Sequence, residues 1–150
     1  MAVFETSINI ACDTQTAFDF LCRPANHARI SPPSLSLRFT DAPEVIVLGS
    51  HLTFEVTNIG QTQQITHEIT AISEFAYTES QVDGPMRSWI HEHVVTHDAG
   101  GCAIIDRIEF EPPGGMLGFL VTENRIRETL QAGFEHSHPM MKQLLESDNT

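Results

Sequence analysis

The chain has 150 residues, of which 41% are hydrophobic and 19% are charged, and its formal net charge is −12. This length is typical of one domain, and the composition excludes wholesale disorder. A surface this acidic repels phosphate backbones and anionic membranes, so the charge argues against nucleic acid as a partner.

The first 30 residues predict one strand and two short helices. Residues 2–10 read as the strand. Asp13 or Thr14 is a good N-cap for a helix over 15–22, whose apolar residues recur at helical spacing. A second short helical turn is predicted over 24–28, because proline is favoured at the first helical position.

From residue 34 to about residue 110 the apolar residues recur with a period of two, which is typical of strands. The predicted strands cover 34–40, 52–56, 65–71, 75–83, 86–97 and 102–110. Turn residues at 58–61, 84–85 and 98–101 separate the longer strands. Short connections join antiparallel neighbours, so the pattern predicts a meander.

The last third of the chain predicts a long helix. A Glu-Pro-Pro-Gly-Gly segment at 111–115 ends the sheet, and helical spacing then runs over 116–146. Such a helix would span roughly 45 Å, at about 1.5 Å per residue. Gly133 and Pro139 predict that it is bent or broken.

The last predicted hairpin can be aligned residue by residue. If Ala99 and Gly100 form a two-residue turn, His93 faces Asp106 across the two strands. A slip by one residue would place Arg107 on the apolar face, which is costly if that face is buried. The predicted inner face carries Trp89, His91, His93, Val95, Cys102, Ile104, Asp106, Ile108 and Phe110.

Two interpretations stay open for His93 and Asp106. A carboxylate beside an imidazole favours the protonated ring or fixes its tautomer, so the pair could be a polar anchor or an acid/base pair in a pocket. Alternatively, the pair is a cross-strand hydrogen bond that satisfies two half-buried polar groups. His91 and His67 also lie on apolar strand faces and are weaker candidates for ligand contact.

The same strand raises the question of a metal site. His91, His93 and Asp106 form a two-histidine, one-carboxylate set, which resembles the HxH element of cupins. The glutamate expected a few residues after the second histidine is missing, and so is a second metal motif. We therefore expect no metal and no other cofactor. The sequence also lacks a glycine-rich phosphate loop and a nucleophile elbow.

Cysteine usage and the N-terminus predict the compartment. Cys12, Cys22 and Cys102 form no CxxC pair, so neither a disulfide framework nor a zinc knuckle is expected. The N-terminus lacks the basic and apolar regions of a signal peptide, and no run of 18 apolar residues occurs. We expect one domain over residues 1–150 in the cytoplasm, without membrane insertion.

Three segments carry a family resemblance: 4–10 with 17–26, the Gly-Pro…Trp-x-His-x-His stretch over 84–93, and 100–106 with 113–118. With the order of elements, they resemble the START/Bet v 1-like superfamily and its SRPBCC (polyketide cyclase/dehydrase-like) proteins. The resemblance implies an α+β helix-grip fold. In it, a curved antiparallel sheet of 6–7 strands wraps around a long C-terminal helix, and two short helices follow the first strand.

The resemblance also implies a cavity between the sheet and the long helix. The residues expected to contact a ligand are Phe54, His67, Trp89, His91, His93, Ile104, Asp106, Ile108, Leu130 and Phe134. Three functions stay open. The first is binding or transport of a small hydrophobic molecule, the partner we expect. The second is a cyclase, aromatase or dehydratase that uses His93 and Asp106 as an acid/base pair. The third is a protein-interaction module of the same fold.

Overall fold

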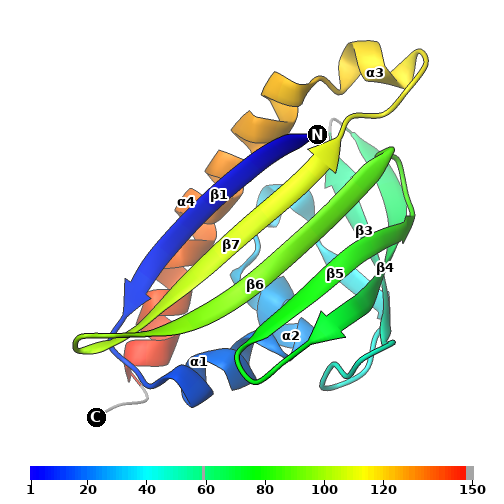
Figure 1. The fold of residues 1–150 in the computed structure, drawn as a ribbon. Helices are drawn as coiled ribbons and strands as arrows, with labels where there is room; N and C mark the ends of the chain where they lie inside the picture. Colours follow the sequence, from blue (N-terminus) through cyan, green and yellow to red (C-terminus); the bar gives the residue numbers. More distant parts are fainter. Residues whose placement is uncertain (59, 148–150) are drawn as a thin grey trace.

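The structure is a computed structural model that describes residues 1–58 and 60–147. Within these residues a seven-stranded antiparallel sheet curves around a long C-terminal helix, which confirms the predicted α+β helix-grip fold (Figure 1). The strands lie in the order β1-β7-β6-β5-β4-β3-β2, so β2 to β7 form a meander and β1 pairs with β7. Their bounds are β1 Ala2–Ile10, β2 Arg38–Asp41, β3 His51–Asn58, β4 Gln61–Ile72, β5 Ala76–Asp83, β6 Ser88–Asp98 and β7 Gly101–Glu111.

The β6–β7 hairpin has the register that the sequence predicted. His93 pairs with Asp106 and Glu92 with Arg107. The turn is tight because Gly100 adopts a φ of +85°, a conformation that costs glycine little. Along β7 every second residue is buried from Cys102 to Phe110, and Asp106 is the one charged residue in that buried row.

Two short helices follow β1, as predicted. In α1 (Thr14–Leu21), the Asp13 carboxylate is the N-cap and accepts a hydrogen bond from the Thr16 amide at 2.7 Å. Proline opens α2 (Pro24–Ile30), which runs two residues beyond the predicted turn.

The prediction of a strand starting at residue 34 was wrong. A 3₁₀ turn, η1 (Pro33–Leu35), occupies that position, and Ser36 adopts a left-handed φ of 47°. Because neither conformation is extended, β2 starts only at Arg38. The turn predicted at 58–61 includes Ile59, which lies outside the described residues.

The C-terminal helical region is divided at Val121 and Thr122 rather than at Gly133 or Pro139. A short helix, α3 (Leu117–Leu120), precedes α4 (Glu123–Ser147). The Thr122 hydroxyl accepts a hydrogen bond from the Arg125 amide at 3.3 Å and so helps to cap the start of α4. α4 continues through Pro139 without interruption. Within the described residues no helix has the length and apolar character needed to cross a membrane.

The packed core consists of two groups of side chains. The larger group joins α1 and the end of α4 to the middle of the sheet and includes Ile10, Phe18, Ile69, Ile104 and Met141. The smaller group contains Phe4, Ile108, Phe110 and Ile126 at the other end of the sheet. The cavities described next lie where α2 and α4 cross the inner face of the sheet.

Candidate functional site

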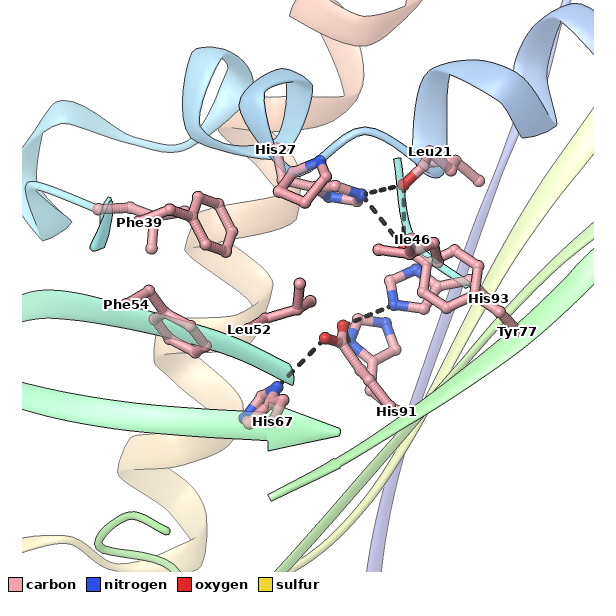
Figure 2. A pocket seen from close by; sticks show the side chains of 13 residues that line it. Leu21, His27, Phe39, Ile46, Leu52, Phe54, His67, Tyr77, His91 and His93 are labelled. Atoms are coloured by element: carbon pink, nitrogen blue, oxygen red, sulfur yellow. Dashed lines mark hydrogen bonds and ion pairs between the residues drawn. The ribbon is translucent and has the colours of Figure 1, made fainter. Parts of the chain in front are cut away.

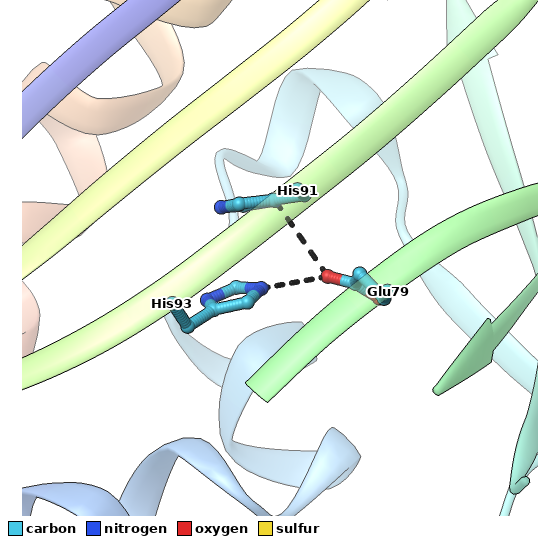
Figure 3. A group of neighbouring side chains, drawn as sticks. All are labelled: Glu79, His91 and His93. Atoms are coloured by element: carbon cyan, nitrogen blue, oxygen red, sulfur yellow. Dashed lines mark hydrogen bonds and ion pairs between the residues drawn. The ribbon is translucent and has the colours of Figure 1, made fainter. Parts of the chain in front are cut away.

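Strands β5 and β6 bring ionisable side chains together on the inner face of the sheet (Figure 3). In the β5–β6 register Tyr77 pairs with His93, and Glu79 pairs with His91. Alternate residues of a strand point to the same face, so these four side chains share one face. Asp106 joins them from β7 because it pairs with His93.

His93 lies between two carboxylates and is almost fully buried, with 3% of its surface exposed. Its Nε2 donates a hydrogen bond to Oε1 of Glu79 at 2.8 Å. Its Nδ1 lies 3.1 Å from Oδ1 of Asp106, an ion-pair distance whose angle falls short of a hydrogen bond. One buried ring thus connects carboxylates from the strands on either side of β6.

His91 stacks on His93, with ring centroids 3.7 Å apart and planes inclined by 22°. Its Nε2 donates to Oδ1 of Asp106 at 2.7 Å, and its Nδ1 lies 3.6 Å from Oε1 of Glu79. The second oxygen of Glu79 accepts a hydrogen bond from Nδ1 of His67 at 3.2 Å. Glu79 therefore contacts three histidines, and Asp106 contacts two.

A second set of polar contacts closes the site on the helix side (Figure 2). The Tyr77 hydroxyl donates to the Leu21 carbonyl at 3.1 Å, and Nε2 of His27 lies 2.7 Å from the same oxygen. The Tyr77 ring stacks on His93 with centroids 4.2 Å apart. The end of α1 and the start of α2 are thus tied to the sheet beside His93.

Burial and the contacts between these side chains shift their pKa values in different directions. Burial lowers the pKa of His91, and the neighbouring His93 lowers it further. Burial would also lower the pKa of His93, but the contacts with Asp106 and Glu79 outweigh it and raise that pKa to about 9. Burial would raise the pKa of Glu79, yet hydrogen bonds from His67 and His93 hold it well below its usual range. The same balance, with His91 and His93 as partners, lowers the pKa of Asp106. At neutral pH His93 is therefore cationic and both carboxylates are anionic.

Two adjoining cavities open from this cluster. The smaller, of about 160 Å³, lies between α2 and strands β3 to β6 (Figure 2). The larger, of about 290 Å³, lies between β6 and α4. His91 and His93 line both, together with Leu21, His27, Leu37 and Phe54. Most of the other lining residues are apolar, so the cavities are mainly hydrophobic and carry their charged groups on the sheet side.

The structure brings together all but two of the residues that the sequence singled out for ligand contact. Phe54, His67, Trp89, His91, His93, Asp106, Leu130 and Phe134 line one cavity or both. Ile104 and Ile108 line neither, because they are fully buried in the two core groups. The inner face of β7 is thus packed by other side chains beside Asp106.

Sequence reasoning missed Glu79, Tyr77, His27 and His138. The alternation of β5 could have placed Tyr77 and Glu79 on one face, but nothing in the chain showed that this face points inward. His27 and His138 belong to α2 and α4 and line the larger cavity. Their positions depend on how the helices dock, for which the sequence offers no local signal.

The grouping of possible metal ligands also differs from the set of His91, His93 and Asp106 that the sequence raised and for which we expected no metal. Glu79, His91 and His93 each offer one ligand atom, all within 4.8 Å of one another. Asp106 instead approaches the opposite nitrogens of the two rings. Carboxylates from both β5 and β7 therefore contact the HxH element, and the one grouped with it as a possible metal ligand is Glu79 of β5.

A family model described as "Polyketide cyclase / dehydrase and lipid transport" matches residues 1–144. No curated protein matches the chain. Among solved structures, a protein from Thermus thermophilus superimposes with a TM-score of 0.74 at 11% identity, covering 99% of this chain and 100% of that one.

Two similar structures are aromatase/cyclases. The Zhui aromatase/cyclase from Streptomyces sp. R1128 has a TM-score of 0.68 at 17% identity, over 98% of this chain and 92% of that one. The di-domain protein StfQ of the steffimycin biosynthetic pathway has a TM-score of 0.75 at 14% identity, over 98% of this chain and 51% of that one. At these identities the likeness extends to the fold alone.

Proposed function

The chain belongs to the family described as polyketide cyclase / dehydrase and lipid transport, and from this premise we propose that it binds a small, uncharged hydrophobic molecule between its sheet and α4. Both hydrophobic-ligand binding and cyclase or dehydrase chemistry fall within that family. The larger cavity, of about 290 Å³, supports the binding role. It has about twice the volume of an engineered cavity of roughly 150 Å³ that binds benzene.

The observation that carries this proposal is a pair of buried, unpartnered polar atoms on residues that line that cavity. Nε1 of Trp89 and Nε2 of His138 are buried and make no hydrogen bond within the described residues. Both residues line the larger cavity. Buried polar groups without partners are costly, so a ligand that offers them oxygen atoms would relieve that cost.

Apolar walls would supply most of the affinity. Phe54, Leu130, Phe134 and Met141 line the larger cavity. A ligand that buries roughly 200 Å² of apolar surface gains about 5 kcal/mol at about 25 cal/mol per Å², before the cost of ordering it. Asp106 lines this cavity, and Glu79 lies behind it across His93. The two carboxylates outweigh the single positive charge of His93, so the cluster disfavours an anion there. A neutral aromatic ketone or polyketide-like molecule fits these conditions.

Calorimetric titration with 2-acetylnaphthalene and with 2-naphthoate tests the proposal. The neutral ketone is expected to bind saturably and to change the fluorescence of Trp89, the single tryptophan, while the carboxylate binds at least tenfold more weakly. Gly133 lines the cavity, and no atom lies within 4 Å of a Cβ added there. Gly133→Leu should therefore fill the cavity and abolish binding, whereas Val82→Leu on an exposed position should not.

Absence of saturable binding for the ketone, or equal binding by Gly133→Leu, would contradict the carrier role. Melting curves of both variants report whether they fold. They show whether a loss of binding comes from a filled cavity or from loss of the folded structure.

Cyclase or dehydratase chemistry is the second candidate, and the position of His93 favours it. The ring lines both cavities, and contacts with Asp106 and Glu79 raise its pKa to about 9, so it can donate a proton at neutral pH. Nε2 of His93 is taken up by Glu79, whereas Nδ1 makes no hydrogen bond, so the proton on Nδ1 is the one that would polarise a ligand carbonyl for ring closure or for loss of water. Asp106 would act through His93 as a positioning residue.

Incubation with a short synthetic β-polyketone thioester tests this second role, with cyclised product measured by chromatography. His93→Gln should lose the product that the wild-type protein forms, while His51→Gln, at an exposed position on β3, should retain it. Equal product with His93→Gln, or without any protein, would eliminate the enzyme role.

The cytoplasm remains our proposal for the compartment. Cys12, Cys22 and Cys102 are buried free thiols. Burial raises the pKa of Cys12 to about 12 and that of Cys22 to about 11. Free rather than disulfide-bonded cysteines are typical of a reducing compartment, and it is this that supports the proposal.

A further inference from the structure

Three ligand atoms converge where the two cavities meet. Oε1 of Glu79 lies 2.8 Å from Nε2 of His93 and 3.6 Å from Nδ1 of His91 (Figure 3). Zinc binds imidazole nitrogen at about 2.0–2.1 Å and carboxylate oxygen at about 2.0–2.2 Å. Ligand atoms around such an ion are then about 3.0 Å apart in octahedral and about 3.4 Å apart in tetrahedral sites. The two separations from Glu79 bracket these values, and all three ligand atoms lie within 4.8 Å of one another.

The two rings also have the outer contacts that metal-binding histidines require. Such a histidine usually donates its other ring N–H to a carboxylate, which fixes the tautomer and the ring orientation. The opposite nitrogens of both rings approach one oxygen of Asp106, Nε2 of His91 at 2.7 Å and Nδ1 of His93 at 3.1 Å. The free oxygen of Glu79 is held by His67 at 3.2 Å. Each of the three ligands therefore has a buried partner behind it.

The contact between His91 and Glu79 is unfavourable while His91 is neutral. Nε2 of His91 donates its proton to Asp106, so the neutral ring has its lone pair on Nδ1. That lone pair faces Oε1 of Glu79 at 3.6 Å, and both groups are acceptors. Burial intensifies the repulsion between them. A metal ion bound to Nδ1 of His91 and Oε1 of Glu79 would convert the repulsion into two bonds. The same ion would take the place of the proton on Nε2 of His93, which is released on binding.

We propose that Glu79, His91 and His93 bind a divalent transition-metal ion, with Asp106 and His67 as the residues that position these ligands. Two imidazoles and one carboxylate form a ligand set that suits zinc and ferrous iron and leaves coordination positions for water or substrate. Those positions face the cavities, because Glu79, His91 and His93 all line the smaller one. The metal goes beyond the ligand binding proposed above, which needs no ion.

Titration with metal ions, in the absence of any hydrophobic ligand, tests the inference. Chelator-treated full-length protein is titrated at pH 7.5 with Zn²⁺ by calorimetry and with Co²⁺ by visible absorption. One ion per chain with a Kd below about 1 µM is expected, together with cobalt bands typical of a low-symmetry site. Glu79→Gln and His91→Gln should each weaken binding at least a hundredfold. Asp106→Asn, which changes only a positioning residue, should weaken it about 10–100-fold.

An exposed histidine–glutamate pair on the same sheet is a matched control. Nε2 of His51 lies 2.9 Å from Oε1 of Glu68, and 57% of the His51 side chain is exposed. His51→Gln should leave zinc affinity within twofold of the wild-type value. Several weak ions per chain, insensitive to every variant, would mark non-specific binding to the acidic surface and overturn the proposal.

One measurement does not depend on any variant. X-ray absorption of zinc-loaded wild-type protein should show the outer-shell scattering of two imidazoles with nitrogen or oxygen at about 2.0–2.1 Å. A spectrum without imidazole scattering would overturn the proposal. The absence of one-to-one binding in protein that circular dichroism shows to be folded would also overturn it. In that case His91 and His93 would bind protons but no metal ion.

Discussion

The clearest test of the buried charge cluster is the dependence of stability on pH. In the folded protein the pKa of His93 is about 9, against an ordinary value of 6.5, because its contacts with Asp106 and Glu79 outweigh burial. A raised pKa contributes stability that is fully present below pH 6.5 and is lost as the pH rises through 9. Since His93 is buried, solvent screens this contribution little.

The size of the stability change follows from the difference between the folded and the ordinary pKa of His93. Each pKa unit corresponds to about 1.4 kcal/mol, so deprotonation of His93 should lower the free energy of unfolding by about 3 kcal/mol between pH 6.5 and pH 9. The other groups that face His93 do not titrate in this window. Burial lowers the pKa values of His91 and His27 and raises that of Tyr77, and the two carboxylates are already ionised.

Urea denaturation of chelator-treated protein at pH 6.5, 7.5, 8.25 and 9 measures the effect through Trp89 fluorescence. With an m-value of about 1–3 kcal/mol per M, the midpoint should fall by about 1–3 M across the series. His93→Gln removes the titrating group, so its midpoint should stay nearly constant. His51→Gln, on the exposed pair with Glu68, should follow the wild-type curve. A flat wild-type profile, or an equal decline in His93→Gln, would refute the assignment of the charge to His93.

Three further changes probe the core, the site and the thiols. Ile104→Ala should lower the free energy of unfolding, measured in urea, by about 2–5 kcal/mol, because Ile104 is fully buried. It should leave ligand affinity unchanged, because Ile104 lines neither cavity. Reduced ligand affinity in the folded variant would contradict this. Glu79→Leu should cost about 3–5 kcal/mol at pH 6.5, since it leaves His93 without one buried counter-charge. A cost near zero, like that expected for Glu68→Leu on the surface, would show that the Glu79 contacts contribute little. Ellman's reagent should detect no thiol in native protein at pH 8 and three in urea, because all three cysteines are buried; fast reaction in the native state would disprove their burial.

Particular residues show how far the sequence could lead. The β6–β7 register followed from a two-residue turn and one apolar face, so the sequence alone paired His93 and Asp106 correctly. The β4–β5 pairing contains two register shifts. A shift changes which side chains meet across the strands, and periodicity alone does not reveal it. Glu79 was absent from the predicted site because nothing in the chain showed that its face of β5 points inward, although it makes more ionic contacts there than Asp106.

The helix predictions also succeeded where the signal is local and failed where packing decides the structure. Asp13 and Pro24 marked the starts of α1 and α2 because capping and proline chemistry act within one turn. Gly133 and Pro139 predicted that the helix is bent or broken. α4 is not broken at either residue, because packing against the sheet outweighs a single missing hydrogen bond. The break lies instead at Val121 and Thr122.

The sequence by itself determined the order of strands and helices, the inner face of β6 and β7 and the family resemblance, all of which depend on local alternation, turns and caps. Only the tertiary structure decided which part of that inner face stays open and which carboxylate meets the two stacked histidines. A cavity is the space that distant elements leave between them, and Glu79, His27 and His138 reach it from three such elements. The distances between these three side chains depend on how β5, α2 and α4 pack together, and residue spacing along the chain does not encode them.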